Sequence, residues 1–282
     1  MKQIILHRNN LPVPGQNPKQ ERKMRTLNNQ GIISGLKNFS AWFKATKFAV
    51  AAFSLVLLFS TTSCLEEYFV NGNHSPATEN RYARNFDAVA SSGEFIVNIV
   101  PGDEYSVRVT AESNLLAYIE TDVVDHTLKI TTRHIYNIHN HEPMTVDIVC
   151  PNLDGLRLSG SGVITADYFE TDNFDVVVSG SGKITADVDA NRIEGDISGS
   201  GDIILTGVAS ETDFNISGSG KIHSYELVQE YCNATVSGSG NMYVNVSKTL
   251  DVTISGSGNV FYINNPSVHT KISGSGGVVN RN

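Results

Sequence analysis

The chain lacks several features that mark common classes of protein. No segment shows a sustained helical spacing of apolar residues, so the sequence does not predict a helical fold. The one long, mainly apolar stretch is residues 48–59, which has the length of a signal-peptide core and is short for a membrane-spanning helix. Cysteine is scarce as well, with three residues in 282, and one of them, Cys64, closes the segment that follows this stretch.

Basic residues are few once the N-terminal segment is set aside. Residues 1–63 hold nine of the 21 Lys and Arg residues but one of the 29 Asp and Glu residues. The remaining chain therefore carries twelve basic and 28 acidic residues, a net charge of −16. Because nucleic acids and anionic membrane surfaces bind basic patches, this balance argues against either as a partner.

Residues 1–63 have the pattern of an export leader. Three lysines lead into the apolar stretch, and the small residues Ser60-Thr-Thr-Ser63 then lead into Cys64. This ending resembles a bacterial lipoprotein signal, in which the cysteine is lipidated and becomes the first residue. We therefore expect lipidation at Cys64 and a lipid-anchored protein of the cell envelope, at the outer membrane, facing the periplasm or the cell surface.

Two alternatives stay open for this leader. Translation could start at Met24, because the segment before the apolar stretch is long for a signal. The stretch could also be an uncleaved anchor, or a secretory signal with an incidental cysteine after it. The following residues 64–80 are rich in Asn, Gly, His, Ser and Pro, and they predict a flexible tether.

The C-terminal half is organised by a repeated Ser-Gly-Ser-Gly motif. The motif occurs seven times at intervals of 18 to 20 residues, starting at Ser159, Ser179, Ser198, Ser217, Ser237, Ser255 and Ser273. Self-similarity at a near-fixed period indicates a repeat architecture in which each unit is one coil stacked on the last. A coil of about 19 residues suits one turn of a parallel β-helix, so residues 151–282 predict an all-β solenoid.

The repeats share an alternation of apolar and polar positions. The residue before each motif is aliphatic and the residue five places after its first serine is apolar, as Ile197 and Ile203 illustrate. These positions differ by an even number, so in an extended chain they face one side. We predict inward-facing aliphatic ladders with the serines at the corners. A left-handed hexapeptide helix is disfavoured, because its third aliphatic column would fall on Glu170 and Lys248.

Residues 81–150 predict a less regular β section that covers one end of the solenoid. The alternating runs on either side of Pro101-Gly102-Asp103 predict a hairpin. Cys150 and Cys232 fall on inward positions about four coils apart. At ~4.8 Å per coil this separation exceeds the reach of a disulfide, so we expect two buried free thiols.

Two groups of side chains are candidates for binding. His139 and His141 would place two imidazoles on one strand face, which is half of a zinc or copper site. The alternative for this pair is a polar loop that holds no metal. Tyr243 and Phe261 fall on successive outward positions and, with Tyr262, predict an aromatic patch for contact with a sugar or a protein.

Acidic residues recur four places before the first serine of several motifs, and they are candidates for a catalytic group. The set is Asp175, Glu194, Asp213 and Asp251. Stacked carboxylates could bind calcium or cleave a sugar chain, but a glycosidase uses one pair of carboxyl groups in unlike environments. A position that repeats along a solenoid is better explained as a solvated face. The sequence therefore predicts no catalytic residue and no cofactor.

The repeats and three further motifs resemble the head GIN domain family. The residues that carry the resemblance are the Ser-Gly-Ser-Gly coils, Arg84–Val89, Ile99–Gly102 and Tyr262–Pro266. One departure is Asn264, where members tend to have glycine two places before the proline. The resemblance covers about 84–279 and implies a right-handed parallel β-helix on an exported, often lipid-anchored protein, in a family labelled "putative autotransporter adhesin".

These observations predict a non-catalytic, adhesin-like binding or structural module that is held at the membrane by a lipid and binds a glycan or a protein. The alternative function is a carbohydrate-active β-helix enzyme that acts on acidic polysaccharide. The last coil, with Ile272 and Val278, has no recognisable cap. Because an uncovered β edge invites pairing with another chain, we also expect a homo-oligomer with contacts near residues 260–282.

Overall fold

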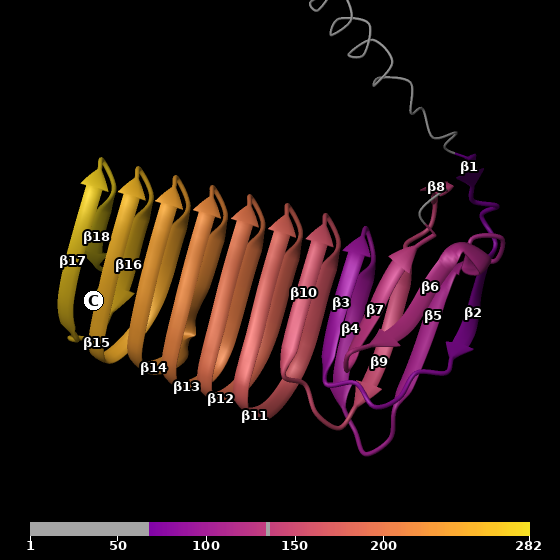
Figure 1. Ribbon diagram of the computed structural model, residues 1–282, viewed down its shortest axis with the longest axis horizontal. Coiled ribbons are helices and arrows are strands. Elements are labelled where there is room, and N and C mark those ends of the chain that lie inside the picture. The colour runs from indigo at the N-terminus through magenta and orange to yellow at the C-terminus, as the bar shows by residue number, and fades with distance from the viewer. Residues whose placement is uncertain (1–67, 134–135) are drawn as a thin grey trace, which may run out of the picture. The chain divides into compact units, whose positions relative to one another are not determined.

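The computed structural model describes residues 68–133 and 136–282. Contacts divide the chain into two units, Met1–Leu65 and Glu66–Asn282, and all described residues belong to the second. These residues form strands, with a single short 3₁₀ turn, η1 (Leu116–Tyr118), and no α-helix (Figure 1). Within the same residues no helix has the length and apolarity needed to cross a membrane.

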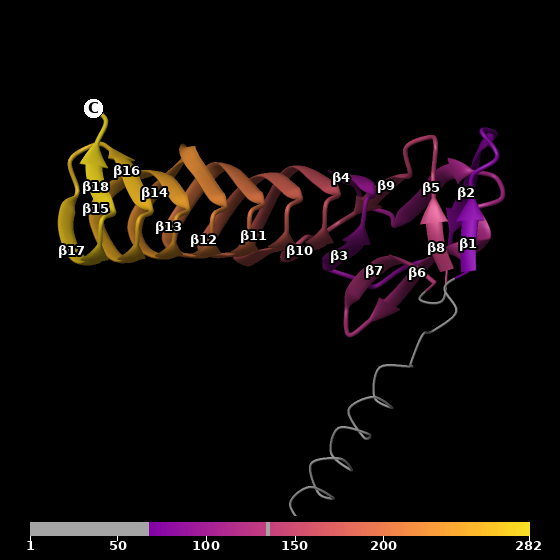
Figure 2. The same cartoon turned by 90° about the horizontal axis from the view of Figure 1, so that it is seen from above.

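The C-terminal part is a stack of parallel coils, as the repeats predict (Figures 1 and 2). In each coil the chain starts at one Ser-Gly-Ser-Gly corner and runs along one face of the stack. It then bends within a long strand and runs back along the other face to the next Ser-Gly-Ser-Gly corner. The strands are β10 (Gly155–Gly160), β11 (Val163–Gly180), β12 (Lys183–Gly199), β13 (Asp202–Gly218), β14 (Lys221–Gly238), β15 (Asn241–Gly256), β16 (Asn259–Ile263), β17 (Ser267–Gly274) and β18 (Gly277–Asn280). The motifs stack in register, so that Ser179 pairs with Ser198 and Ser198 with Ser217.

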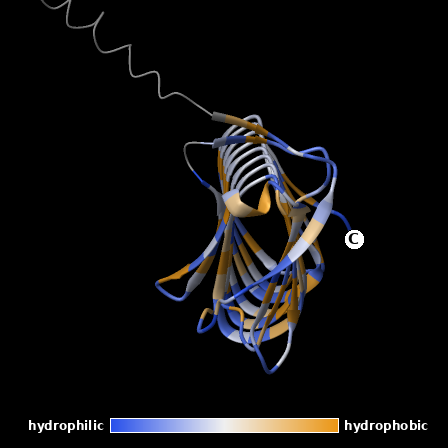
Figure 3. Ribbon diagram, turned by 90° about the vertical axis from the view of Figure 1, so that its right-hand side faces the viewer, coloured by the Kyte–Doolittle hydropathy of each residue, from blue (hydrophilic) through white to orange (hydrophobic). Residues whose placement is uncertain are grey.

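Aliphatic ladders fill the space between the two faces of the stack. Figure 3 shows the ribbon of these two faces, viewed along the stack. Ile197, Ile216 and Val236 pair in one column, and each is at most 2% exposed. The column five places after each first serine is fully buried from Ile164 to Val260. The predicted inward positions are therefore correct, and each fully buried side chain of this size contributes roughly 1.5–3 kcal/mol.

Both glycines of the motif are required by the close approach of successive corners. The first has a left-handed backbone, with φ of +136° at Gly218. The second is buried, and a Cβ at Gly201 would lie 2.6 Å from the carbonyl oxygen of Gly182 and 2.5 Å from Cγ1 of Val178. The serines of the corner are largely outside the core.

A further coil precedes the seven motifs. Strands β3 (Ala88–Gly93) and β4 (Ile96–Pro101) pair with β10 and β11, and they align Ser92-Gly93 with the first two residues of the motif at Ser159. Gly93 keeps the left-handed backbone, with φ of +120°. Phe95 is fully buried where the motif has its second glycine. The repeat pattern did not predict this coil, because Glu94 and Phe95 stand where the motif has its second serine and second glycine.

The predicted hairpin between residues 95–99 and 105–109 is wrong. Strand β9 (Thr145–Cys150) lies between β4 and β5 (Ser106–Glu112), parallel to the first and antiparallel to the second. Parallel pairing with β4 lets β9 extend the solenoid core by one more coil, together with β7 (Thr127–Thr132), which pairs with β3. The coil made by β7 and β9 is therefore nearer the N-terminal end of the stack than the coil made by β3 and β4, although β7 and β9 come later in the sequence.

Antiparallel strands finish the N-terminal end of the stack. β2 (Pro76–Arg81) pairs with β5, and β6 (Ile119–Val124) pairs with β7. β2 carries a proline and two charged residues on the free edge, and such features discourage pairing with another chain. The section 81–150 thus adds coils, and its strand β6 covers the end together with β2, which comes before it.

Part of the segment predicted as a flexible tether is ordered. Strand β1 (Tyr68–Asn71) pairs with β8 (Tyr136–His139) in a two-stranded sheet, here called the ribbon, and β2 follows it. The sequence did not predict this pairing, because β1 and β8 are about 68 residues apart along the chain. At the other end, β17 and β18 form the outermost described coil, where Ile272 is 43% exposed.

The two cysteines of the described residues are free and buried. Burial raises the pKa of the Cys150 thiol to about 12, and burial likewise raises the pKa of the Cys232 thiol to about 12. Both are therefore protonated and act as small apolar side chains, as predicted.

Candidate functional site

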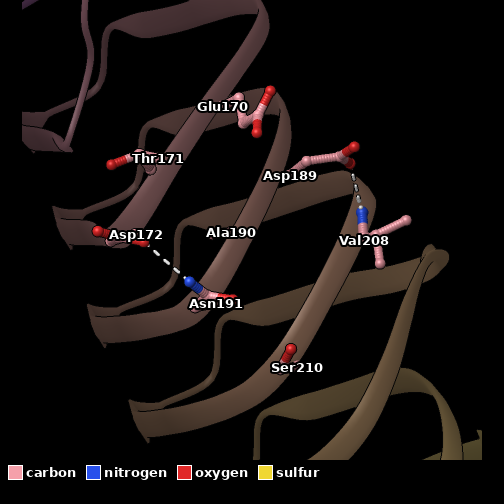
Figure 4. Close-up of a pocket in the computed structure, with 8 residues that line it drawn as sticks. All are labelled: Glu170, Thr171, Asp172, Asp189, Ala190, Asn191, Val208 and Ser210. Carbon is pink, nitrogen blue, oxygen red and sulfur yellow. Dashed lines mark hydrogen bonds between the residues drawn. The ribbon is translucent and has the colours of Figure 1, made fainter.

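An open acidic cleft of about 610 Å³ crosses three coils at the bends of β11, β12 and β13 (Figure 4). Its lining residues are Glu170, Thr171, Asp172, Asp189, Ala190, Asn191, Val208 and Ser210. They come from equivalent bends, because Glu170 pairs with Asp189 and Asp189 with Val208. The cleft is thus formed by the same bend of the chain, repeated in three successive coils.

Two of the three carboxylates of this cleft, those of Asp172 and Asp189, are engaged by the neighbouring coils. Asp189 accepts hydrogen bonds from the Val208 amide at 2.9 Å and from the Tyr168 hydroxyl at 3.1 Å. Asp172 accepts one from the Asn191 side chain at 2.8 Å. The hydrogen bond to Asp189, together with burial and nearby carboxylates, raises the pKa of Tyr168. These contacts tie coil to coil, and they are the contacts of a structural ladder.

The predicted acidic column is present on the face that leads up to the corners. Asp175, Glu194 and Asp213 pair in register. Burial and, next, the charge of Glu194 raise the pKa of Asp175. Arg192 spans the column, with nitrogen–oxygen distances of 2.9 Å to Glu194, 2.8 Å to Glu211 and 3.7 Å to Asp213. Such a repeated, salt-bridged and exposed column stabilises weakly and offers no isolated acid–base pair.

The aromatic residues form a stack along the outer face. The ring centroids of His223 and Tyr243 are 4.6 Å apart, and those of Tyr243 and Phe261 are 5.1 Å apart, in both cases nearly parallel. The Arg281 guanidinium covers the other side of Phe261 at 4.9 Å from the ring centroid. The ring faces are therefore occupied, and the ring edges are what remains for a ligand.

Tyr262 does not belong to this patch. It pairs with Val244, which is fully buried, so it stands in an inward column and packs against the core. The prediction grouped it with Phe261 because the two are adjacent in sequence, but adjacent residues of a strand face opposite sides.

The predicted histidine pair lies near the ribbon. The rings of His139 and His141 meet edge to face with centroids 5.5 Å apart. The structure adds His74, whose ring stacks on His141 at 4.1 Å and which the sequence gave no reason to place there. Among residues 68–133 and 136–282 no three His, Cys, Asp or Glu side chains are grouped to hold a metal ion. A metal at His139 and His141 stays a prediction, and Cys64 lies outside the described residues.

A buried carboxylate fastens the ribbon to the solenoid. Glu112, at the end of β5, is fully buried, and its two oxygens accept backbone hydrogen bonds from His74 at 2.5 Å, His141 at 2.8 Å and Glu142 at 3.4 Å. A Cβ on Gly72 would lie 1.9 Å from the carboxylate, so glycine is needed there. Burial raises the pKa of Glu112, but the backbone hydrogen bonds from His141, His74 and Glu142 outweigh it and hold this pKa below its usual value.

Replacing Glu112 by Gln is expected to loosen the ribbon near neutral pH, because the amide offers a single acceptor oxygen. Hydrogen exchange of residues 69–74 and 136–144 should become faster, while exchange in β12 and β13 is unchanged. The carboxylate stabilises the fold above its unfolded-state pKa, and this contribution is lost as the pH falls through the lower folded-state value. In urea unfolding, the gap between wild type and Glu112→Gln should therefore shrink toward pH 3. A gap that is constant with pH would contradict this role.

The fold and its surface define a class: a parallel β-solenoid that presents open, in-register columns of polar and aromatic side chains. Residues 85–266 match the family described as "Putative auto-transporter adhesin, head GIN domain". The match covers more than half of the chain, so the chain belongs to this family, and the predicted resemblance is confirmed.

Solved structures share the fold. A "putative adhesin" from Bacteroides fragilis aligns with a TM-score of 0.69 and 21% identity, over 75% of this chain and 100% of that chain. A "putative adhesin" from Parabacteroides merdae gives 0.64 and 23%, over 76% and 100%. A "putative lipid binding protein" from Parabacteroides distasonis gives 0.66 and 22%, over 76% and 100%. Among curated proteins no match is found.

Proposed function

We propose that the protein is a cell-envelope lipoprotein whose solenoid is a non-catalytic, adhesin-like binding module. The observation that carries the proposal is the engagement of the surface carboxylates: Asp172, Asp189 and Glu194 are hydrogen-bonded or ion-paired between or within coils. Groups used in this way hold a rigid surface in place and are not poised to move a proton. Membership of a family described as adhesins supports the same function.

The sequence of residues 1–64, with its apolar stretch followed by small residues and Cys64, supports the lipid anchor in this proposal. Cys64→Ser should abolish lipidation and shift the exported protein from the membrane fraction to the soluble fraction, because the acyl chains supply the membrane affinity. Fractionation of washed membranes followed by immunoblotting measures the shift, and Cys150→Ser is the matched control. Retention of the Cys64→Ser protein on washed membranes would reject the anchor.

The outermost described coil supports self-association as a further part of the proposal. Ile272 is 43% exposed and Val278 is half-buried, while the corresponding residues of the preceding coil, Ile254 and Val260, are at most 1% exposed. Pairing of this coil with a second copy would cover both. Light scattering of the purified protein at tens of micromolar distinguishes a monomer from an oligomer.

A further inference from the structure

A second cavity lies between the ribbon and the first corners of the solenoid. It has a volume of about 490 Å³ and is more enclosed than the acidic cleft at the bends. Its lining residues are Gly93, Glu94, Thr132, Tyr136, Asn137, Ile138, His139, Asn140 and Met144. We call it the ribbon groove. It occurs where the chain departs from the repeat, at the corner that joins β7 to β9 in place of a Ser-Gly-Ser-Gly motif.

The ribbon that forms one side of this groove is held in place. Its strand β8 pairs with β1, and Ile138 packs against the solenoid core. The Tyr136 ring contacts the Tyr118 ring, with centroids 4.6 Å apart. Glu112 fixes the chain just beyond β8 through the His141 amide. A ligand entering the groove would therefore meet a ribbon whose backbone is already positioned, which lowers the entropy cost of binding.

The chemistry of the groove is that of a site for hydroxyl groups. Asn137, His139 and Glu94 are exposed and together offer amide, imidazole and carboxylate groups that both donate and accept hydrogen bonds. Phe69, which lies outside the lining of the groove, is 71% exposed and in register with Asn137 across the ribbon. An exposed ring next to polar side chains matches a sugar, which has an apolar C–H face and a rim of hydroxyls.

The charge of the groove selects among sugars. Glu94 is the one acidic residue of its lining, and no Lys or Arg is among the lining residues. A uronic acid or a phosphate would meet this carboxylate without a cation to offset it. A lipid chain would leave the side-chain amide of Asn137 without a partner, which is costly.

We propose that the ribbon groove binds a neutral saccharide, with Asn137, His139 and Glu94 as hydrogen-bonding residues and Phe69 as the stacking ring. The inference rests on the proposed function, for which it names the ligand class and the site. It places recognition at the ribbon, away from the aromatic stack of Tyr243 and Phe261, whose ring faces are occupied.

The test uses the full chain, purified in detergent, on immobilised neutral hexose and N-acetylhexosamine oligosaccharides, with uronic-acid oligosaccharides as comparison. Binding to neutral sugars is expected, and Asn137→Ala, His139→Ala and Phe69→Ala should each weaken it about tenfold. The matched controls Asn191→Ala in the acidic cleft and Tyr231→Ala on the outer face should bind as wild type does. Thermal unfolding of every variant checks that the fold is retained.

The outcomes separate this inference from the proposed function. Binding that is lost in Asn191→Ala and kept in the three ribbon variants would overturn the groove and leave a binding module. Binding to uronic-acid oligosaccharides alone, or to no saccharide, would overturn the ligand class. Cleavage of a bound oligosaccharide, detected by mass spectrometry of the eluate, would overturn the non-catalytic function and favour the carbohydrate-active alternative.

Discussion

Val236→Asp is expected to abolish the cooperative folding of the central coils. Val236 is fully buried and pairs with Ile216 on one side and Ile254 on the other, so the new carboxyl group would have aliphatic neighbours in both adjacent coils. Burying such a group without a partner costs on the order of 4 kcal/mol. That is a large share of the roughly 5–15 kcal/mol by which a domain is stable. Urea unfolding followed by circular dichroism measures the loss.

The matched control is Thr235→Asp, one residue earlier. Thr235 lies on the outward side of the same strand and pairs with Asn215 and Thr253, so a carboxylate there remains in contact with water. We expect a change within about 0.5–1 kcal/mol. Equal destabilisation by the two substitutions would mean that the columns are not divided into an inner and an outer set as described.

The regular coils could be predicted from the sequence because every coil repeats the same physical problem. Ile197, Ile216 and Val236 must each cover the residue below and be covered by the one above, so the same side-chain class recurs at a fixed interval. The coil of β3 and β4 escaped because Glu94 and Phe95 replace half of its motif. The hairpin prediction failed for a related reason: local alternation predicts a strand but does not specify its partner, and β9 is that partner.

The surface could be predicted only where it follows the period. The contact of Tyr243 with Phe261 follows from their 18-residue separation, whereas the covering of Phe261 by Arg281 depends on a residue outside the motif. Glu112 and His74 are 38 residues apart and meet through one backbone hydrogen bond. No spacing rule relates such residues, so the contacts of Glu112 and the ribbon groove could be found only in the structure.

Gly218→Ala is expected to destabilise the solenoid although it adds one methyl group. Gly218 has a φ of +136°, which side-chain-bearing residues rarely adopt, and its Cβ would lie 2.3 Å from the carbonyl oxygen of Gly199. The obstacle is backbone of the preceding corner, which is itself fixed by pairing on both sides, so it cannot move aside as a flexible side chain would. Strain of this kind costs about 1–3 kcal/mol, and the displaced corner adds lost pairing to it.

We therefore expect Gly218→Ala to lower the free energy of unfolding by about 2–4 kcal/mol in urea titrations. Ser217→Ala and Ser219→Ala are the matched controls, because both serines flank the same glycine and both are exposed. Each should change the free energy of unfolding by less than about 0.5 kcal/mol. If the serine variants were as unstable as Gly218→Ala, the serine hydroxyls would have to hold the corner together. If the glycine variant were silent, the corners would have room to separate, and the tight stacking that requires two glycines in every motif would be refuted.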